Sequence, residues 1–331
     1  MKLGVAIVGC GLIGIKRADT LDDLVLRVSV DVDPVKAEAL ASRFPGCRPM
    51  TDWRDAVNDK QVNVVIVSTP HNSLAEIMAG AIAAGCHVLV EKPAARFMAE
   101  LDPLITMAKR QNVLVRVGFN HRCHRAFQKM REIVDAGEIG ELMFLRARYG
   151  HGGRLGYEQE WRAQPELSGG GELIDQGVHL IDLARWFLGD FSEVDGFAHT
   201  YYWDMPVDDN AFMLLKTEDQ RTAFLHVSCT EWKNTFSFEL YGRNGKLQVD
   251  GLGGSYGVER LTWYKMLPEM GPPETVSWEY PMHDNSWQVE MNQFRQDIEL
   301  GRQPQPGLID AVAVLQIVES LYDKSGYDHR P

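Results

Sequence analysis

The stretch Val5-Ala6-Ile7-Val8-Gly9-Cys10-Gly11-Leu12-Ile13-Gly14 lies near the start of the chain and decides its fold. A short apolar run that ends in glycine is typical of a strand buried on both faces. The glycines have the spacing G-x-G-x-x-G between this strand and a helix that we expect to reach about Leu21. In that context they allow a tight turn and the close approach of a pyrophosphate. The stretch therefore predicts a dinucleotide-binding fold.

Predicted strands and helices alternate from this stretch to about residue 120. We expect further strands at 26–30, 62–68, 87–91 and 113–118, and helices at 35–44, 73–85 and 101–111. Ser73-Leu74-Ala75-Glu76 has the form of a capping box, which predicts that the second of these helices begins there. The alternation indicates a parallel sheet with helices on both faces. Residues 1–120 are thus predicted to form an α/β Rossmann domain.

The remaining residues, 121–331, have a different pattern. After a predicted helix at about 172–188, the segments 222–231 and 235–241 alternate apolar and polar residues, with a turn at 242–245. Two helices, at about 287–300 and 308–322, end the chain. Strands grouped in this way predict an α+β domain with a mostly antiparallel, open-faced sheet. We expect this domain to bind substrate and to oligomerise, with the last helices free to pack back on the first domain.

Composition narrows the class of protein. The chain has 331 residues, 45% apolar residues and a net charge of −12. This acidic balance argues against a nucleic-acid or membrane partner. Five cysteines without a C-x-x-C pair indicate neither a disulfide framework nor a zinc site, and no apolar run reaches the length of a membrane span. We expect a cytoplasmic protein without a bound metal.

Asp31 ends the second predicted strand, 17 residues after Gly14. A carboxylate at this place accepts hydrogen bonds from the adenosine ribose hydroxyls and repels a 2′-phosphate. The predicted cofactor is therefore NAD rather than NADP.

Two further motifs carry candidate chemistry. Lys92, in Glu91-Lys92-Pro93, follows the fourth strand at the sheet edge where ligands bind, although most lysines are simply solvated. Asp175 and His179 follow a glycine run, and together with Asp182 their spacing places them on one stripe of a helix. An imidazole beside a carboxylate suits proton exchange near neutral pH. The alternative for this second motif is a capping aspartate and a buried core histidine.

These motifs together resemble the glucose–fructose oxidoreductase/inositol dehydrogenase (Gfo/Idh/MocA) family of NAD(P)-dependent sugar oxidoreductases. The likeness is ordered along nearly the whole chain. It runs through 9–14, Asp31, Thr69-Pro70, Glu91-Lys92-Pro93, Gly118-Phe119-Asn120-His121-Arg122 and 169–182. The resemblance implies catalytic roles for Lys92, Asp175 and His179 around a substrate beside the nicotinamide. It also implies that the Lys92-Pro93 peptide is cis. The family often has a histidine three or four residues after the T-P pair. This chain has Ser73-Leu74-Ala75 there and carries His71 instead, directly after Pro70.

The expected ligand contacts follow from the motifs and the resemblance. The cofactor-binding set is Gly9, Gly11, Leu12, Ile13, Gly14, Asp31, Thr69, Pro70, Glu91 and Lys92. The substrate-binding set is Lys92, Asn120, Arg122, Arg154, Trp161, Arg162, Asp175 and His179. The three arginines are candidates for a carboxylate or phosphate of the substrate, because the guanidinium fork fits both anions. The alternative is that they are surface arginines on a loop.

The predicted function is an NAD-dependent oxidoreductase that interconverts a secondary alcohol and a ketone on a sugar or nucleotide-sugar pyranose. His179 takes the hydroxyl proton, Asp175 orients its ring, and Lys92 polarises the substrate oxygen. Whether Lys92 or His179 is the base stays open at this point. Two alternatives keep the fold: transient use of tightly bound NAD for hydrolysis or isomerisation, and a non-catalytic regulator that binds NAD and a sugar.

The second-domain sheet also predicts the quaternary structure. Phe224 and His226 point away from Leu225 and Val227, and Phe197, Tyr201 and Trp203 form another alternating set. An uncovered aromatic sheet face usually marks a protein interface. We expect a homodimer or homotetramer, and the family resemblance implies the same.

Overall fold

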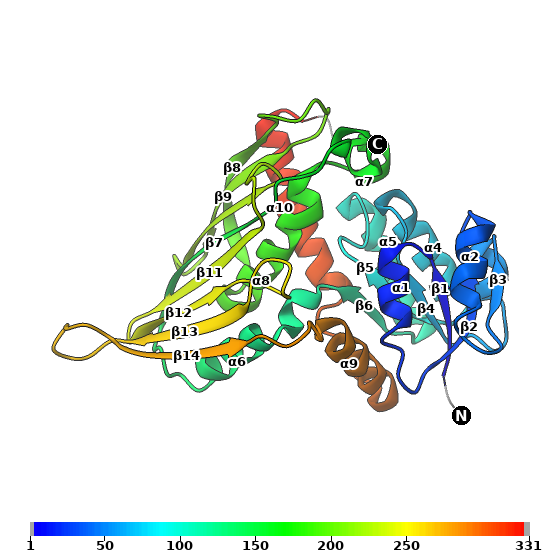
Figure 1. Cartoon of the computed structure of the whole chain (residues 1–331), viewed down its shortest axis with the longest axis horizontal. Helices are drawn as coiled ribbons and strands as arrows, with labels where there is room; N and C mark the ends of the chain where they lie inside the picture. Colours follow the sequence, from blue (N-terminus) through cyan, green and yellow to red (C-terminus); the bar gives the residue numbers. More distant parts are fainter. Residues whose placement is uncertain (1–2, 328–331) are drawn as a thin grey trace. The chain divides into compact units, whose positions relative to one another are not determined.

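The computed structural model describes residues 3–327 and divides the chain into two compact units (Figure 1). Of the described residues, the first unit contains 3–119 together with Trp287–Val312, and the second contains Asn120–Ser286 together with 313–327. The division lies next to the domain boundary predicted at residue 120. The segment 287–312 was assigned to the second domain by sequence, with its helices free to pack back on the first domain, and it clusters with the first unit.

A parallel sheet of six strands forms the centre of the first unit. Its strands are β1 (Gly4–Val8), β2 (Val25–Val30), β3 (Arg48–Met50), β4 (Val64–Val67), β5 (His87–Glu91) and β6 (Val115–Gly118), in the order β3-β2-β1-β4-β5-β6. The predicted parallel sheet is thereby confirmed. The order reverses between β1 and β4, and the carboxyl ends of strands at such a point are where ligands bind.

Helices pack around this sheet because its strands are apolar on both faces. They are α1 (Leu12–Ala18), α2 (Pro34–Ala41), α3 (Trp53–Val57), α4 (His71–Ala83), α5 (Met98–Gln111), α9 (Ser286–Leu300) and the start of α10 (Leu308–Ser325). Met291 and Phe294 of α9 are buried in one core with Val5 and Ile7 of β1. The helix predicted to begin at Ser73 begins at His71, which is buried. Ser73 donates to Thr69 Oγ1 (2.9 Å), so it ties the helix to the preceding loop.

A sheet of eight strands forms the second unit. It contains β7 (Leu142–Gly150), β8 (Phe191–His199), β9 (Asn210–Thr217), β10 (Thr222–Ser228), β11 (Thr235–Gly242), β12 (Gly245–Asp250), β13 (Glu259–Lys265) and β14 (Glu274–Tyr280). The order is β14-β13-β12-β11-β7-β10-β9-β8, and only the β7–β10 pair is parallel. The mostly antiparallel sheet is thus confirmed.

Helices cover only one face of this second sheet in the described part of the chain (Figure 1). They are α6 (Arg125–Asp135), α8 (Val178–Leu188) and the rest of α10. On the opposite face Phe224 is 47% exposed, whereas Leu225 and Val227 of the same strand are fully buried. Tyr201 and Trp203, expected beside Phe224, lie instead in the loop after β8, because that strand ends at His199.

The helix predicted at 172–188 is also modified. Leu173–Gly177 forms a π-helical turn, and only Val178–Leu188 is α-helical. A π turn changes the angular spacing of side chains, so Asp175 and His179 do not share the simple α-helical stripe that was expected with Asp182. Such turns are frequent at functional sites.

Candidate functional site

The glycine turn after β1 has the geometry of a ligand cradle. Gly9 has φ +95°, and a Cβ there would lie 2.5 Å from the Ser68 carbonyl oxygen. A Cβ on Gly14 would lie 1.9 Å from the Gly9 carbonyl oxygen, so only glycine lets α1 pack this closely. A Cβ on Gly11 would meet no described atom within 4 Å. The turn is therefore closed toward the protein and open at Gly11, where a phosphate group has room to approach the backbone.

Asp31 lies directly beside this turn. Its Oδ2 accepts a hydrogen bond from the Cys10 backbone N–H (2.8 Å), and its Oδ1 accepts one from Asp33 N–H (3.0 Å). These bonds fix the carboxylate at the end of β2, as a ribose acceptor requires. Leu12, also in the predicted cofactor set, is 71% exposed beside the turn. The residues present thus fit a dinucleotide.

The loop after β4 is tied to the same turn. Ser68 donates to the Gly9 carbonyl oxygen (2.8 Å), a contact that the sequence did not suggest. Thr69 and Pro70 follow, and Pro70 is the N-cap of α4. The predicted cofactor residues at Gly9, Asp31 and Thr69 are therefore neighbours at one edge of the first-unit sheet.

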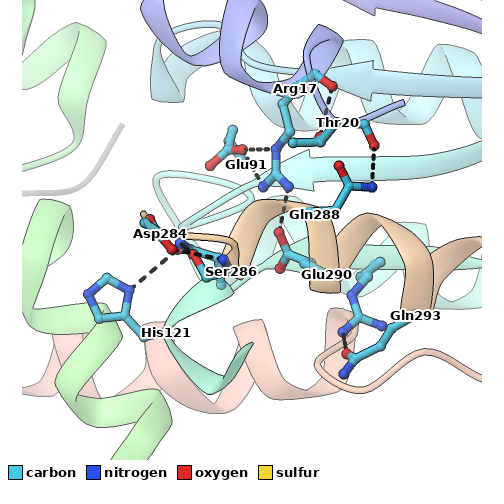
Figure 2. Close-up of polar contacts among 11 residues, drawn as sticks. Arg17, Thr20, Glu91, His121, Asp284, Ser286, Gln288, Glu290 and Gln293 are labelled. Atoms are coloured by element: carbon cyan, nitrogen blue, oxygen red, sulfur yellow. Dashed lines mark hydrogen bonds and ion pairs between the residues drawn. The ribbon is translucent and has the colours of Figure 1, made fainter. Parts of the chain in front are cut away.

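Lys92 follows β5 at the same sheet edge, and the Lys92-Pro93 peptide is cis, as the family resemblance implied. Its neighbour Glu91, expected to contact the cofactor, is directed instead to Arg17: Nε and Nη2 of Arg17 lie 2.7 and 2.6 Å from Glu91 Oε1. Figure 2 shows the Arg17 guanidinium between Glu91 and Glu290, whose Oε2 lies 2.5 Å from Nη1. Arg17 and Glu290 are fully buried. This ion-pair chain fixes the backbone immediately before Lys92.

His179 is buried in the second unit among aromatic rings. Its ring stacks on His121, with centroids 3.7 Å apart and planes 22° apart. Tyr149 lies near both histidines, and burial holds the pKa of its hydroxyl well above the usual value, so it stays a neutral donor. His121 lies next to Asn120, whose side chain donates to Ser286 Oγ (2.9 Å). These rings restrict the plane of the His179 imidazole.

Asp175 lies on the π-helical turn and is buried. Its Oδ2 accepts a hydrogen bond from Arg162 Nε (2.9 Å), and this carboxylate raises the pKa of Arg162 above its usual value. The structure thus brings together two residues of the predicted substrate set. Arg162 was expected to bind a substrate anion, but here it neutralises Asp175.

Two other predicted arginines are paired as well. Arg122 donates to both oxygens of Asp182 (2.8 and 2.6 Å) in a buried, bidentate ion pair. Arg122 therefore holds α8 against the 3-10 helix Asn120–Cys123, and its place in the substrate-binding set stays a prediction. Arg154 is exposed and pairs with Glu160 (2.7 Å). The Arg162 guanidinium lies over the Trp161 ring, with its Cζ 4.6 Å from the ring centroid.

A buried carboxylate missed by the sequence analysis supports the Asp175 segment. Asp208 accepts hydrogen bonds from the backbone N–H groups of Gly171 (2.9 Å) and Leu173 (2.7 Å), and from the Tyr322 hydroxyl (2.7 Å). A Cβ on Gly171 would lie 1.9 Å from the Asp208 carbonyl oxygen, so the glycine run lets this aspartate approach. Burial raises the pKa of Asp208 to about 6. The described residues contain no group of side chains arranged to hold a metal ion.

His151 is a second candidate that the sequence left unassigned. Its Nδ1 accepts a hydrogen bond from Gly153 N–H (3.0 Å), and its Nε2 lies 3.7 Å from Glu172. Burial is the main cause that lowers the pKa of His151 below its usual value. This histidine is thus a neutral donor near the Asp175 segment.

Comparisons with known proteins agree with this arrangement. Residues 3–119 match the family model described as "Oxidoreductase family, NAD-binding Rossmann fold", and residues 127–248 match the "GFO/IDH/MocA C-terminal domain". A levoglucosan dehydrogenase of Pseudarthrobacter phenanthrenivorans is 31% identical over 58% of this chain and 50% of that protein. The chain thus aligns with about half the length of this relative.

Solved structures extend the likeness to the whole chain. A levoglucosan dehydrogenase in complex with NADH and levoglucosan has the same fold, with a TM-score of 0.89, 22% identity and 98% of both chains covered. GenD2 from gentamicin A biosynthesis, in complex with NAD, gives a TM-score of 0.83 at 28% identity, covering 99% of this chain and 95% of that one. With both units matched by models of one family, this chain belongs to the GFO/IDH/MocA oxidoreductase family, and its first unit is that family's NAD-binding Rossmann fold.

Proposed function

We propose that this protein is an NAD-dependent sugar dehydrogenase that interconverts a secondary alcohol and a ketone on a pyranose. The observation that carries the proposal is the buried His179 ring, stacked on His121 and four residues after the buried Asp175, in a chain whose other unit is a Rossmann fold. The levoglucosan dehydrogenase relative supports a sugar as substrate. A nucleotide-linked sugar is less favoured as substrate. The arginines that could bind its phosphates, Arg122, Arg154 and Arg162, are each paired with a carboxylate.

In this proposal the chain's own residues hold the cofactor and move the proton. The turn from Gly9 to Gly14 and the Asp31 carboxylate bind the dinucleotide, with Thr69 and Pro70 beside them. When bound, NAD supplies the hydride acceptor. A base of this chain would take the hydroxyl proton of the substrate, and the bound cofactor would take up the hydride from the same carbon, which together account for the oxidation of the alcohol to a ketone.

The candidate bases are His179 and Lys92. A ring that is fixed by stacking accepts a proton in one direction, which favours His179 as the base. Lys92 then polarises the substrate oxygen as an ammonium donor. Arg162 neutralises part of the Asp175 charge. In this proposal Asp175 orients the His179 ring from the π-helical turn that precedes α8.

A steady-state assay of NADH formation with a panel of sugars tests this function. We expect Lys92→Ala to lower turnover by about a hundredfold or more, as for the loss of an oxyanion donor, with NAD affinity nearly unchanged. Because the base must be unprotonated to act, the rate of the unmodified protein should fall at low pH. This fall should vanish in His179→Ala. If it survives there and vanishes in Lys92→Met, the base is Lys92. Absence of any sugar-dependent NADH would contradict the proposed activity.

We also propose that the protein is a homodimer or homotetramer that associates through the uncovered face of the second-unit sheet. Phe144, Phe197, Leu214 and Phe224 are all more than a third exposed on the strands of this sheet. Isolated monomers rarely expose a contiguous apolar patch of this kind. A cytoplasmic location remains our proposal, consistent with five cysteines that are all free. No helix among residues 3–327 is long and apolar enough to cross a membrane.

A further inference from the structure

Three aromatic side chains in the second unit form what we call the aromatic corner: Tyr202, Trp203 and Trp232. The Tyr202 and Trp232 rings meet edge to face, with centroids 4.8 Å apart and planes at 86°. They are 57% and 69% exposed, respectively. The Trp203 ring also meets the Tyr202 ring edge to face (5.2 Å) and is less exposed. Two planar surfaces at right angles are thus presented at the protein surface.

A buried carboxylate is dedicated to holding this corner in place. Asp209 is fully buried and accepts hydrogen bonds from three successive backbone N–H groups: Tyr201 (2.9 Å), Tyr202 (2.7 Å) and Trp203 (3.1 Å). Hydrogen bonds to a charged acceptor are about twice as strong as neutral ones. The Trp203 indole also donates to the Cys229 carbonyl oxygen (3.0 Å). The exposed rings therefore stand on a preorganised backbone rather than on a mobile loop.

The segment Gly150-His151-Gly152-Gly153-Arg154 packs against the corner. A Cβ on Gly153 would lie 2.3 Å from the Trp203 ring, and a Cβ on Gly152 would lie 3.2 Å from the Trp232 backbone. Trp232 itself has φ +56°, a conformation that bulky residues rarely adopt and that clusters at functional sites. Because Gly152 and Gly153 have no side chains, both tryptophans can pack against this segment.

The corner is continuous with the Asp175 site. Trp203 contacts Tyr157 (5.5 Å), and Tyr157 contacts His151 (5.7 Å), whose Nε2 lies near Glu172. Tyr157 is buried, and the Glu172 and Asp175 carboxylates add to the effect of burial in raising its pKa. A row of rings therefore leads from the buried carboxylates out to Trp232.

We infer that the aromatic corner is a stacking subsite for a second, uncharged sugar ring, so that the substrate is a disaccharide or another glycoside. This inference rests on the proposed function. The apolar C–H face of a pyranose fits the electron-rich face of an aromatic ring. Arg154 and Arg162 are paired with Glu160 and Asp175, which favours a neutral ring over a nucleotide diphosphate.

The test compares Trp232→Ala and Tyr202→Ala with Tyr201→Ala as the matched control. Tyr201 is equally exposed and is held by the same Asp209, but its ring packs on His199 (4.7 Å) rather than on the corner. Glucose, methyl glucosides, maltose, cellobiose and UDP-glucose are assayed for NADH formation. The unmodified protein should prefer a disaccharide, and Trp232→Ala should lower kcat/KM for it about tenfold. Values for the monosaccharides, and all values for Tyr201→Ala, should stay the same.

Three outcomes would overturn the subsite. The first is an equal loss for monosaccharides and disaccharides in Trp232→Ala. The second is a preference for UDP-glucose that depends on Trp232, which would assign the corner to a nucleobase. The third is dissociation of the assembly by Trp232→Ala in light scattering, which would make the corner a contact between copies.

Saturation-transfer NMR with the disaccharide separates this inference from the proposed function, because it measures binding without turnover. If no sugar is oxidised but disaccharide binding is lost in Trp232→Ala, the dehydrogenase activity fails and the subsite stands. If sugar is oxidised and binding does not depend on Trp232 or Tyr202, the subsite fails and the activity stands.

Discussion

The imidazole rings of His121 and His179 stack with their centroids 3.7 Å apart. The pair is supported by His124, which contacts His121 edge to face (5.6 Å) and whose Nδ1 lies 2.9 Å from the Glu259 carboxylate. Glu259 in turn accepts a hydrogen bond from the Ala126 backbone N–H at the start of α6. The orientation of the proposed base is thereby linked to the packing of a helix on the sheet.

This stacking predicts different results for two substitutions of His121. His121→Ala removes the ring that fixes His179 and should lower kcat several-fold, whereas His121→Phe keeps a planar ring and should retain most of the activity. Turnover of NADH, measured together with the melting temperature of each variant, checks this. A phenylalanine variant no more active than the alanine variant, at equal stability, would show that the polar contact of His121 with Asn120 matters instead.

Asp31 is predicted to set the choice of cofactor. Because its carboxylate accepts ribose hydroxyls and repels a 2′-phosphate, Asp31→Ala should weaken NAD binding by roughly tenfold or more and NADP binding much less. Fluorescence titration with both cofactors measures this. Asp33→Ala is the control, since Asp33 caps α2 through Val35 N–H (3.0 Å) and should affect both cofactors alike. Equal losses in Asp31→Ala would remove its assignment to the ribose.

Asp208 is predicted to make stability depend on pH in an unusual direction. Burial raises its pKa to about 6 from an ordinary value of 3.8, so the folded state binds this proton more tightly than the unfolded state. The contribution of Asp208 to the free energy of unfolding is therefore greatest below about pH 4 and falls as the pH rises to about 6. Urea unfolding across pH 4–7 should show the advantage of the unmodified protein over Asp208→Asn shrinking in this window. An advantage that grows with pH would mean that the hydrogen bonds to Asp208 outweigh its burial.

The uncovered sheet face is predicted to form the interface between copies. Light scattering should give a mass at least twice the 37.3 kDa of one chain, and Phe224→Asp should lower it by burying a charge in the contact. Ile309→Asp, which adds the same charge at an exposed apolar position at the start of α10 and away from this sheet, serves as the control. A stable monomer of the unmodified chain at micromolar concentration would contradict the proposed assembly.

The sequence predicted the first unit well because its strands are continuous apolar runs, which are readable without tertiary information. β3 was missed because it has only three residues, none of them fully buried, and contains Pro49. β7 was missed because Arg146 and Arg148 occupy its outer face and hide the alternation. The π turn at Leu173–Gly177 follows from contacts with Asp208, 35 residues away, and has no local signal.

In the candidate site, too, only the residues that stand in local motifs could be predicted from the sequence. Lys92, Asp175 and His179 stand in local motifs, so they could be found by spacing. Their supports could not: Arg17 and Glu290 are 273 residues apart in sequence, and Asp208 and Asp209 read as an acidic pair in a loop. The one available signal for this ion pair was the position of Arg17 in the helix that follows the glycine turn. An arginine is rarely buried unless it is paired, so its burial there would predict an acidic partner.

Transfer of a labelled hydrogen is the most direct test of the claim that this chain oxidises a sugar hydroxyl with NAD. The sugar that gives the highest rate of NADH formation is prepared with deuterium at the reacting carbon, and the NADH formed is isolated and examined by NMR. We expect deuterium at C4 of the nicotinamide together with a primary isotope effect on kcat, and a net yield of one ketone per NADH. Deuterium that returns to the sugar product without net NADH would indicate transient use of bound NAD, and no transfer with any sugar bound by the protein would contradict the dehydrogenase altogether.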